Sequence, residues 1–514
     1  MQGAEIELKA ALPPADLNRI GRSLARRATA GGTRFLVTRY FDTSDRVLEA
    51  AGIAWRLRSS PGTPVIQSIK AGRKALGGFQ SSEECEAVIG GTRPDLGAIP
   101  DSALSARLRA LIAGRPLVPK FETRVRRRIC RLAVPGGEVE VAIDRGQIRA
   151  GRRREPICEI EFELKAGSPE ILFALASQWL GRAPARLVLP NKAERGAALA
   201  SGTPLAPAVL SSKPIDARRG LPAGERFEQH LSRFAEAVAA NLHLTLSAGE
   251  PEGPHQLRVA LRRLRTALRL HRPILDRGLA DDLSIAARDM GRIVSPLRDA
   301  DVVAGGLLIP RADPMLAAAL GQWQEEVRVA VRQQLREAAA TGLAIRLLSL
   351  AVLGGWQRPG RRHRLLLPHE EVVRPGIERL WARIAHAGNR LAGLSPEARH
   401  QFRKDLKKFR YALEQISSDA TPTGLGMRLK RLLEDLGNLN DLAVLEGFAP
   451  DLGPEANAAL AKLKAGLPHA STARRDQLLG RACRHWQALA ALSPPGEWLA
   501  LSGPPPSALA EPNR

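Results

Sequence analysis

Short segments in which polar and apolar residues alternate dominate roughly the first 200 residues of the chain. A period of two predicts β-strands. The clearest segments read AEIELKA, RFLVTRYFDT, IAWRLRS, VIQSIKA, EVEVAID and ICEIEFELK. Helical spacing between them predicts helices over residues 15–28 and 169–180. The first part of the chain, residues 1–203, is therefore predicted to be a β-rich domain.

A Pro-, Gly- and Ser-rich stretch over residues 204–225 predicts a linker. From about Phe227 onward, strand signals give way to long amphipathic segments rich in Leu, Ala and Arg, which predict an all-α domain over residues 226–500. Residues 501–514 are Pro-rich, and we expect them to be disordered.

The predicted helical domain contains an internal repeat. HQLRVALRRLRTAL, from His255, resembles HQFRKDLKKFRYAL, from His400, and SPLRDADVV, from Ser295, resembles GNLNDLAVL, from Gly437. The two pairs keep nearly the same offset. We therefore expect two pseudo-symmetric halves, about residues 226–350 and 370–500, each with one basic helix.

Charge narrows the choice of partners. The chain has 77 Lys and Arg against 53 Asp and Glu, a formal net charge of +24, which favours nucleic acid, an acidic membrane surface or a phosphate polymer. An aromatic content of 4% disfavours proteins that stack bases on exposed rings.

The cysteines and the apolar stretches indicate no further class of site. The four cysteines are scattered and predict neither disulfides nor a zinc site. The N-terminus lacks an export signal, and the longest apolar stretch, about residues 347–356, is too short to cross a bilayer. We expect a cytoplasmic protein that does not act at membranes.

Several predicted strands carry charged residues on one face and apolar residues on the other. The charged positions are Glu5, Glu7 and Lys9; Arg56 and Arg58; Lys70; Glu138 and Glu140, before Asp144; and Glu159, Glu161 and Glu163. For a single strand, the simpler interpretation is a solvated outer face of a sheet. Acidic and basic strands together favour a closed barrel whose polar side faces inward. Such a lumen suits metal-assisted phosphoryl transfer, since carboxylates bind Mg²⁺ or Mn²⁺ while Lys and Arg bind phosphate oxygens.

These motifs resemble the CYTH domain, the triphosphate tunnel metalloenzyme family. The resemblance covers about residues 1–200 and begins with the Glu-x-Glu-x-Lys of Glu5, Glu7 and Lys9. It continues, in order, through YFDT, WRLR, SIK, FETRVRR, EVAIDRG, ICEIEFEL and NKAERG. It implies an eight-stranded antiparallel tunnel, and hence an α+β multidomain chain with an N-terminal β-barrel and a C-terminal helical bundle.

The resemblance also implies roles for individual residues. Glu5, Glu7 and Lys9 form the catalytic set. The triphosphate would be bound by Arg56, Arg58, Lys70, Arg127, Lys192 and Arg195. A Mg²⁺ or Mn²⁺ ion would be held by residues drawn from Glu5, Glu7, Glu84, Glu86, Asp144, Glu159 and Glu161. The implied reaction is attack of a metal-activated water on a terminal phosphorus.

The chain departs from the family pattern at three places. Ser81 or Ser82 stands where an Arg is usual, Cys85 stands at an aromatic position, and Asn191 replaces a Ser. These changes leave the implied ligand sets largely intact. The Arg-to-Ser departure at Ser81 or Ser82 favours an alternative in which the barrel binds anions without turnover.

Each basic helix of the repeat is amphipathic at 100° per residue. In the first copy, His255, Arg258, Arg262, Arg265 and Arg269 share one face, opposite Leu257, Leu261, Leu264 and Leu268. In the second, His400, Arg403, Lys404, Lys407, Arg410 and Tyr411 lie opposite Phe402, Leu406, Phe409 and Leu413. A solvated basic face is one interpretation, but a duplicated, self-repelling stripe favours an anionic ligand.

This pattern, with LRDADV after the first copy and LEDLGNLNDLAV after the second, resembles the CHAD domain, a conserved-histidine α-helical family. The resemblance implies inorganic polyphosphate binding. The implied ligands are His255, Arg258, Arg262, Arg265, His400, Arg403, Lys407 and Arg410. We expect Asp299, Asp301 and Asp441 to orient these cations through salt bridges.

The sequence thus predicts a divalent-metal-dependent inorganic triphosphatase whose helical domain binds polyphosphate and associates with polyphosphate granules. A non-catalytic polyphosphate-binding protein is one alternative. Thiamine-triphosphatase or adenylate-cyclase activity in the same barrel is another. Nucleic-acid binding is less favoured, because no recognition helix or stacking platform accompanies the basic stripe.

Overall fold

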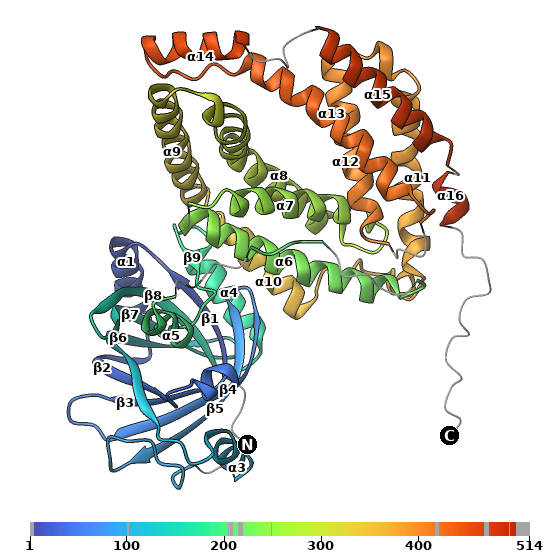
Figure 1. The fold of residues 1–514 in the computed structure, drawn as a ribbon. Helices are drawn as coiled ribbons and strands as arrows, with labels where there is room; N and C mark the ends of the chain where they lie inside the picture. Colours follow the sequence, from blue (N-terminus) through green and yellow to red (C-terminus); the bar gives the residue numbers. More distant parts are fainter. Residues whose placement is uncertain are drawn as a thin grey trace, which may run out of the picture. The chain divides into compact units, whose positions relative to one another are not determined.

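The computed structural model describes residues 5–99, 102–203, 205, 209–213, 219–247, 249–416, 421–466, 472–492 and 494–499 (Figure 1). The predicted tail, residues 501–514, lies outside the described residues, as does much of the predicted linker. In the described part of the chain, no helix combines the length and apolarity needed to cross a membrane.

The chain forms two compact units. The first comprises Met1–Leu210, Ala239–Gly249 and Arg336–Leu353, and the second comprises Ser211–Val238, Glu250–Leu335 and Gly354–Arg514. The domain and linker boundaries drawn from the sequence remain predictions.

The first unit contains the strands. They are β1 (Glu5–Ala11), β2 (Ala30–Asp42), β3 (Ala54–Ser59), β4 (Val65–Leu76), β5 (Phe79–Ile89), β6 (Val118–Val134), β7 (Gly137–Ala150), β8 (Arg153–Ala166) and β9 (Arg186–Leu187). The hydrogen-bonded order is β5-β4-β3-β2-β6-β7-β8-β1, and β1 pairs again with β5, so eight antiparallel strands close into a barrel. The predicted eight-stranded antiparallel barrel is therefore confirmed. The short strand β9 adds to β1.

Among the described residues in the first part of the chain, four helices lie between strands, and a fifth follows the last strand. They are α1 (Pro14–Ala25), α2 (Val47–Ala50), α3 (Ser102–Ile112), α4 (Pro169–Leu180) and α5 (Lys192–Ser201). The apolar outer side of the barrel packs against several of them. One such cluster joins Trp55 and Ile69 of the barrel with Leu48 of α2 and Leu108 of α3. Because helices cover the apolar side, the polar side of these strands faces the lumen.

The remaining helices confirm an all-α region after the barrel. They are α6 (Ala223–Ser247), α7 (Glu252–Leu270), α8 (Arg277–Ala300), α9 (Pro314–Glu337), α10 (Thr341–Leu353), α11 (His369–Gly388), α12 (Pro396–Leu413), α13 (Leu425–Gly447), α14 (Pro454–Gly466), α15 (Thr472–Ala490) and α16 (Pro495–Trp498). A π-helical stretch, Asp301–Leu308, follows α8 directly. Within the first unit, which includes α10, the helix α10 packs against α4.

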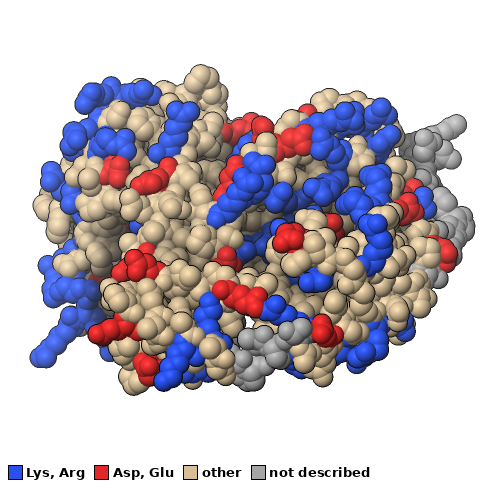
Figure 2. Space-filling view, turned by 90° about the horizontal axis from the view of Figure 1, so that it is seen from above, with Lys and Arg blue, Asp and Glu red and all other residues tan. Residues whose placement is uncertain are grey.

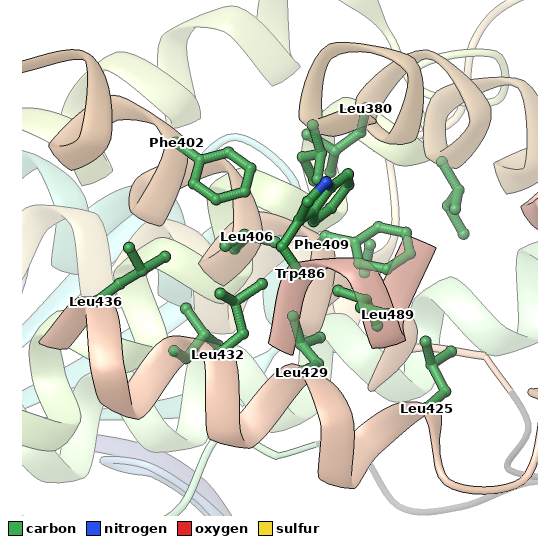
Figure 3. Close-up of a cluster of buried hydrophobic side chains, with 14 of the residues drawn as sticks. Leu380, Phe402, Leu406, Phe409, Leu425, Leu429, Leu432, Leu436, Trp486 and Leu489 are labelled. Carbon is green, nitrogen blue, oxygen red and sulfur yellow. The ribbon is translucent and has the colours of Figure 1, made fainter. Parts of the chain in front are cut away.

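The second unit has its largest described apolar cluster around α12 (Figure 3). Phe402, Leu406 and Phe409 are buried against leucines of α13 and against Trp486 of α15. These are the residues predicted to lie behind the second basic face. Their burial fixes the rotation of α12, which leaves its cations on the side away from this cluster.

Candidate functional site

The first strand places its charged residues together, as the alternation predicted. Leu8 and Ala10 are fully buried on one face of β1. On the other face, Glu7 and Lys9 are 5% and 8% exposed, and Lys9 Nζ lies 2.9 Å from Glu7 Oε1. Burial lowers the pKa of Lys9, but Glu161 and Glu7 outweigh this effect and raise it. Lys9 is therefore charged at neutral pH.

Lys192 is surrounded by three buried carboxylates. Its Nζ lies 2.9 Å from Asp144 Oδ2, 3.0 Å from Glu159 Oε2 and 2.5 Å from Glu161 Oε1. Burial disfavours the ammonium, yet these carboxylates raise the pKa of Lys192 well above its usual value. Lys192 opens α5, so the helix delivers one cation to side chains from β7 and β8.

Arg127 of β6 joins the same group. Its guanidinium donates to both oxygens of Asp144, at 2.7 and 2.6 Å, and to Glu161 Oε2 at 2.8 Å. Arg195 of α5 pairs with Glu159 and with Glu155, the latter at 2.6 Å. The structure thus brings together Lys9, Arg127, Lys192, Arg195, Asp144, Glu159 and Glu161 from the predicted set.

A second group forms on β1, β3, β4 and β5. Lys70 pairs with Glu5 and lies 3.5 Å from Glu84, while Arg56 donates to Glu84 at 2.7 Å. Burial raises the pKa of Glu84, but Arg56 and Lys70 prevail and lower it. The pKa of Glu5 is raised, first by burial and then by Glu7. Carboxylate charge at Glu5 is therefore incompletely balanced by the cations around it.

Arg58 differs from the other cations of the lumen. Among the described residues its buried Nε has no hydrogen-bond partner. Arg56 foremost, then burial, then Arg127, lower its pKa to about 10. Arg58 is thus a charged group repelled by its neighbours, and an anionic ligand would relieve this repulsion.

The strand β5 shows which serine replaces the usual arginine. Ser82 is buried and its Oγ donates to Glu5 Oε2 at 3.3 Å, and Glu5 pairs with Ser82 in the strand register. Glu84 shares this face, and Glu86 follows on it but is exposed. Cys85 points the other way, into the outer apolar cluster with Trp55. Ser82, rather than Ser81, therefore holds the lumen position.

Two lumen residues were missed from the sequence. Arg73 donates to Gln80 at 2.7 Å and to the Leu189 carbonyl at 2.8 Å, and Gln80 donates to Glu7 at 2.8 Å. Alternation alone would place Arg73 on the outer face. The register of β4 shifts between Ala71 and Lys74, at a bulge where Gly72 has φ +62°, and this bulge turns the Arg73 side chain inward.

Asn191 fulfils a local structural role. Its side chain accepts a hydrogen bond from the Glu194 backbone N–H at 2.9 Å, and the Glu194 side chain accepts one from the Asn191 backbone at 2.7 Å. This capping box begins α5 and so positions Lys192. A serine could cap the helix in the same way, which explains why the replacement leaves the site intact.

The carboxylates fit a hard divalent ion. Glu5 and Glu7 offer oxygen ligands next to each other on one face, with Glu84 close to Glu5, and the raised pKa of Glu5 marks a position where added positive charge is favourable. Glu163 lies beside Glu7 and Glu140 in the register, and its pKa is raised mainly by burial. These residues could hold Mg²⁺ or Mn²⁺.

The second unit brings the two predicted basic helices together. The helices α7 and α12 pack against each other. Burial first, then Arg403, Arg262, Arg410 and Arg258, lower the pKa of Lys407 to about 7. Five of the predicted polyphosphate ligands, on two helices, are therefore close enough for their positive charges to repel one another. Figure 2 shows many Lys and Arg side chains gathered over the right half of the face that it displays.

The two halves of the repeat use matching contacts. Arg258 Nη1 lies 3.4 Å from the Ser295 carbonyl, and the Arg403 guanidinium lies against Gly437. His400 Nδ1 lies 2.6 Å from Asn440 Oδ1, whereas the first copy has Arg298 near His255. Burial is the main cause that lowers the pKa of both histidines.

The three aspartates expected to orient these cations behave differently. Asp299 lies 3.5 Å from Arg258, and the charge of Asp441 acts on Arg403. Asp301 instead pairs with Arg328 of α9 at 3.3 Å and accepts from Gln324 at 2.7 Å. The expectation for Asp301 was therefore wrong, because Asp301 continues the helical backbone two residues beyond Asp299, about 200° farther around the axis, and so faces α9 rather than α7.

Two further residues that were predicted on the basic faces of α7 and α12, Arg265 and Tyr411, have neighbours outside the group around Lys407. The pKa of Arg265 is lowered, by burial and then by cations that include Arg288 of α8. Tyr411, expected on the basic face, is only 3% exposed and lies beneath the guanidinium groups of Arg263 and Arg410. Arg263, which the sequence did not single out, donates to Glu414 at 2.7 Å and so ties α7 to the end of α12.

Known protein families match both the barrel and the helical part of the chain. The model of the CYTH domain matches residues 3–197, and the model of the CHAD domain matches residues 229–450. A curated inorganic triphosphatase of Haemophilus influenzae is 28% identical over 203 residues, which cover 38% of this chain and 55% of that protein. The chain thus spans about half the length of this relative.

Solved structures of low identity also match. The CHAD domain of the plant Ricinus communis is 24% identical with a TM-score of 0.45, covering 56% of this chain and 98% of that one. A putative adenylyl cyclase from Hippeastrum, described as having a dominant triphosphatase activity, is 21% identical with a TM-score of 0.29, covering 39% and 98%. The two family matches, in the order in which the barrel and the helices occur, identify the chain as a CYTH domain followed by a CHAD domain.

Proposed function

We propose that the barrel hydrolyses inorganic triphosphate with Mg²⁺ or Mn²⁺, and that the helical domain binds inorganic polyphosphate. The observation that carries the first part is the lumen, in which buried carboxylates stand among buried Lys and Arg, with Arg58 repelled by the cations beside it. A triphosphate and a divalent ion together supply the opposite charge for each of these groups.

In this proposal the Lys and Arg side chains bind the triphosphate, and the carboxylates bind the metal ion. Arg56, Lys70, Arg127, Lys192 and Arg195 each pair with a carboxylate, and these ion pairs can be exchanged for phosphate oxygens. Their charges would offset the negative charge that spreads over the phosphoryl oxygens in the transition state.

The metal ligands would come from the acidic residues. Glu5 and Glu7, with Glu84, Glu86, Asp144, Glu159 and Glu161 as further candidates, would hold the ion. A bound divalent ion would supply charge neutralisation and a more acidic water. Lys9, charged and held beside Glu7, would bind the phosphate nearest that carboxylate.

For the helical domain, the proposal rests on the cations that α7 and α12 bring together. The low pKa of Lys407 reflects repulsion among cations on both helices, and a polyanion bound across them would remove it. The ligands we propose are His255, Arg258, Arg262, Arg265, His400, Arg403, Lys407 and Arg410. Such binding would place the protein on polyphosphate granules in the cytoplasm.

Phosphate release from inorganic triphosphate tests the barrel. We expect release with Mg²⁺ or Mn²⁺ but not with EDTA, and a loss of at least about 100-fold in Glu5→Gln/Glu7→Gln, because several kcal/mol of charge stabilisation is removed. Glu83→Gln is the matched control, since Glu83 lies on β5 but is exposed and alternates with Ser82 and Glu84. Glu83→Gln should retain wild-type activity.

The same assay separates the alternatives. Folded wild type that binds triphosphate without releasing phosphate would favour a non-catalytic receptor, as the serine at position 82 allows. Faster turnover of thiamine triphosphate, or cyclisation of ATP, would move the proposal to those substrates. Salt-sensitive DNA or RNA binding that polyphosphate cannot displace would favour a nucleic-acid partner for the helical domain.

A further inference from the structure

Three histidines far apart in the sequence meet inside the second unit. His230 lies on α6, His271 directly follows α7, and His369 opens α11. Each is at most 2% exposed. His271 Nε2 lies 2.9 Å from His369 Nε2, and one ring nitrogen from each histidine lies within 4.8 Å of the others. No other group of three metal-binding side chains is this close in the part of the chain that the structure describes.

The hydrogen bonds around the cluster leave ring-nitrogen lone pairs on His271 and His230, while His369 Nε2–H donates to His271 Nε2 and must move its proton to Nδ1 before His369 can bind a metal ion. His271 Nδ1 lies 2.9 Å from the Ala267 carbonyl, so it carries the proton and Nε2 keeps a lone pair. The ring of His230 hydrogen-bonds the Gln415 backbone, and its buried Nε2 has no hydrogen-bond partner among the described residues. Backbone carbonyls that fix the outer nitrogen of a histidine are the usual support of a metal-ligating imidazole.

The three rings are neutral. Burial is the main cause that lowers the pKa of His271 to about 4 and the pKa values of His230 and His369 well below the usual value. Arg226, itself buried, lowers all three further. Neutral imidazole is the form that binds a metal ion.

A role in packing alone explains the three buried histidines less well than a metal site does. Aromatic side chains lie beside the histidines: Phe227 packs at a tilted angle against both His271 and Trp356, and Phe234 stacks against His230. In such surroundings apolar side chains would pack without polar atoms to satisfy. A single hydrogen bond between His271 and His369 leaves the inward nitrogen of His230 unused.

We propose that His230, His271 and His369 bind one Zn²⁺ ion, which links α6, α7 and α11 within the helical unit. Tetrahedral Zn²⁺ with Zn–N bonds of about 2.0–2.1 Å needs nitrogens about 3.3 Å apart. The separations here, 2.9 Å for one pair and up to 4.8 Å, bracket that distance, so small side-chain shifts suffice. Three imidazoles leave the fourth position to a water molecule.

Metal analysis of the full-length, untagged protein tests the proposal. The protein is purified with saturating Mg²⁺ to occupy oxygen sites, supplied with Zn²⁺ and passed over a desalting column, and its zinc is counted. We expect about one equivalent per chain in wild type and in Glu5→Gln/Glu7→Gln. We expect it to be lost in His271→Phe and His369→Gln. His386→Gln is the matched control, because His386 is exposed and should leave the zinc unchanged.

Two further measurements use the wild-type protein, so they do not depend on whether a histidine variant folds. Co²⁺ in place of Zn²⁺ should give the strong visible absorption of a four-coordinate, nitrogen-bound ion. Zn²⁺ at ~100 times its dissociation constant should raise the Tm of wild type by about 5–10 °C, and EDTA should reverse the rise. Wild type that retains no zinc and shows no Tm shift would overturn the proposal. Zinc that survives in both histidine variants would overturn it as well.

Discussion

Replacing Lys407 by arginine should remove the pH dependence of polyphosphate binding. The pKa of Lys407 falls from 10.5 to about 7, first through burial and then through Arg403, Arg262, Arg410 and Arg258. Wild-type Lys407 therefore loses its proton as the pH rises through neutrality. If the anion binds the protonated form, affinity should fall about tenfold between pH 6 and pH 8, following the charged fraction.

The neighbouring histidines, His255 and His400, do not account for a change of affinity between pH 6 and pH 8. Burial first lowers the pKa values of His255 and His400 below the usual value, so both lose their protons at a lower pH than an exposed histidine. An arginine at position 407 stays charged throughout, so Lys407→Arg should bind with nearly constant affinity over the same range.

The measurement is titration of labelled long-chain polyphosphate, followed by fluorescence anisotropy at constant ionic strength. Lys404→Arg is the control, because Lys404 lies on the same helix but is exposed. It should keep the wild-type slope. A wild-type affinity that does not change with pH, or a slope that persists in Lys407→Arg, would refute the reasoning. Folding stability should change with pH in the opposite direction to polyphosphate affinity. The unfolded chain holds the Lys407 proton more tightly than the folded protein does, so the free energy of unfolding should rise from pH 7 toward pH 10.

Three substitutions test the packing and charge of the two units. Arg58→Met should raise the KM for triphosphate about tenfold while the Tm stays constant or rises, because a self-repelling cation is removed. Gly196→Ala would place a Cβ 2.0 Å from the Phe121 ring, so we expect a loss of about 1–3 kcal/mol in urea unfolding and reduced activity as α5 shifts. Asp435→Asn should cost about 2 kcal/mol in the same assay, since the buried carboxylate accepts from His485 at 2.7 Å; unchanged stability would contradict that.

Much of the lumen follows from the sequence because a strand has a fixed period. Alternation in β1 separates Glu7 and Lys9 from Leu8 and Ala10, and the structure keeps that division. The same rule failed at Arg73, because the bulge at Gly72 adds a residue to β4 and reverses the faces. Helical periodicity likewise predicted which side of α12 is buried, with Tyr411 as the exception.

The partners of each charge were decided only by the tertiary structure. Asp301, at the end of α8, pairs with Arg328 of α9, and no periodicity in the sequence shows that α9 packs against this point. Arg58 shares the inner face of β3 with Arg56, as alternation predicts, but its other repelling neighbour, Arg127, lies on β6 and comes near only because both strands line the same lumen.

The sequence by itself determined the division into a strand-rich and a helical part, the buried faces of regular elements such as β1 and α12 apart from Tyr411, and the residue types that suit phosphate and metal. These depend on local period and composition. It could not show that Lys407 shares its surroundings with α7, or that His271 and His369, 98 residues apart, meet. Such meetings depend on how helices pack, and long-range packing is set by the whole core rather than by any local pattern.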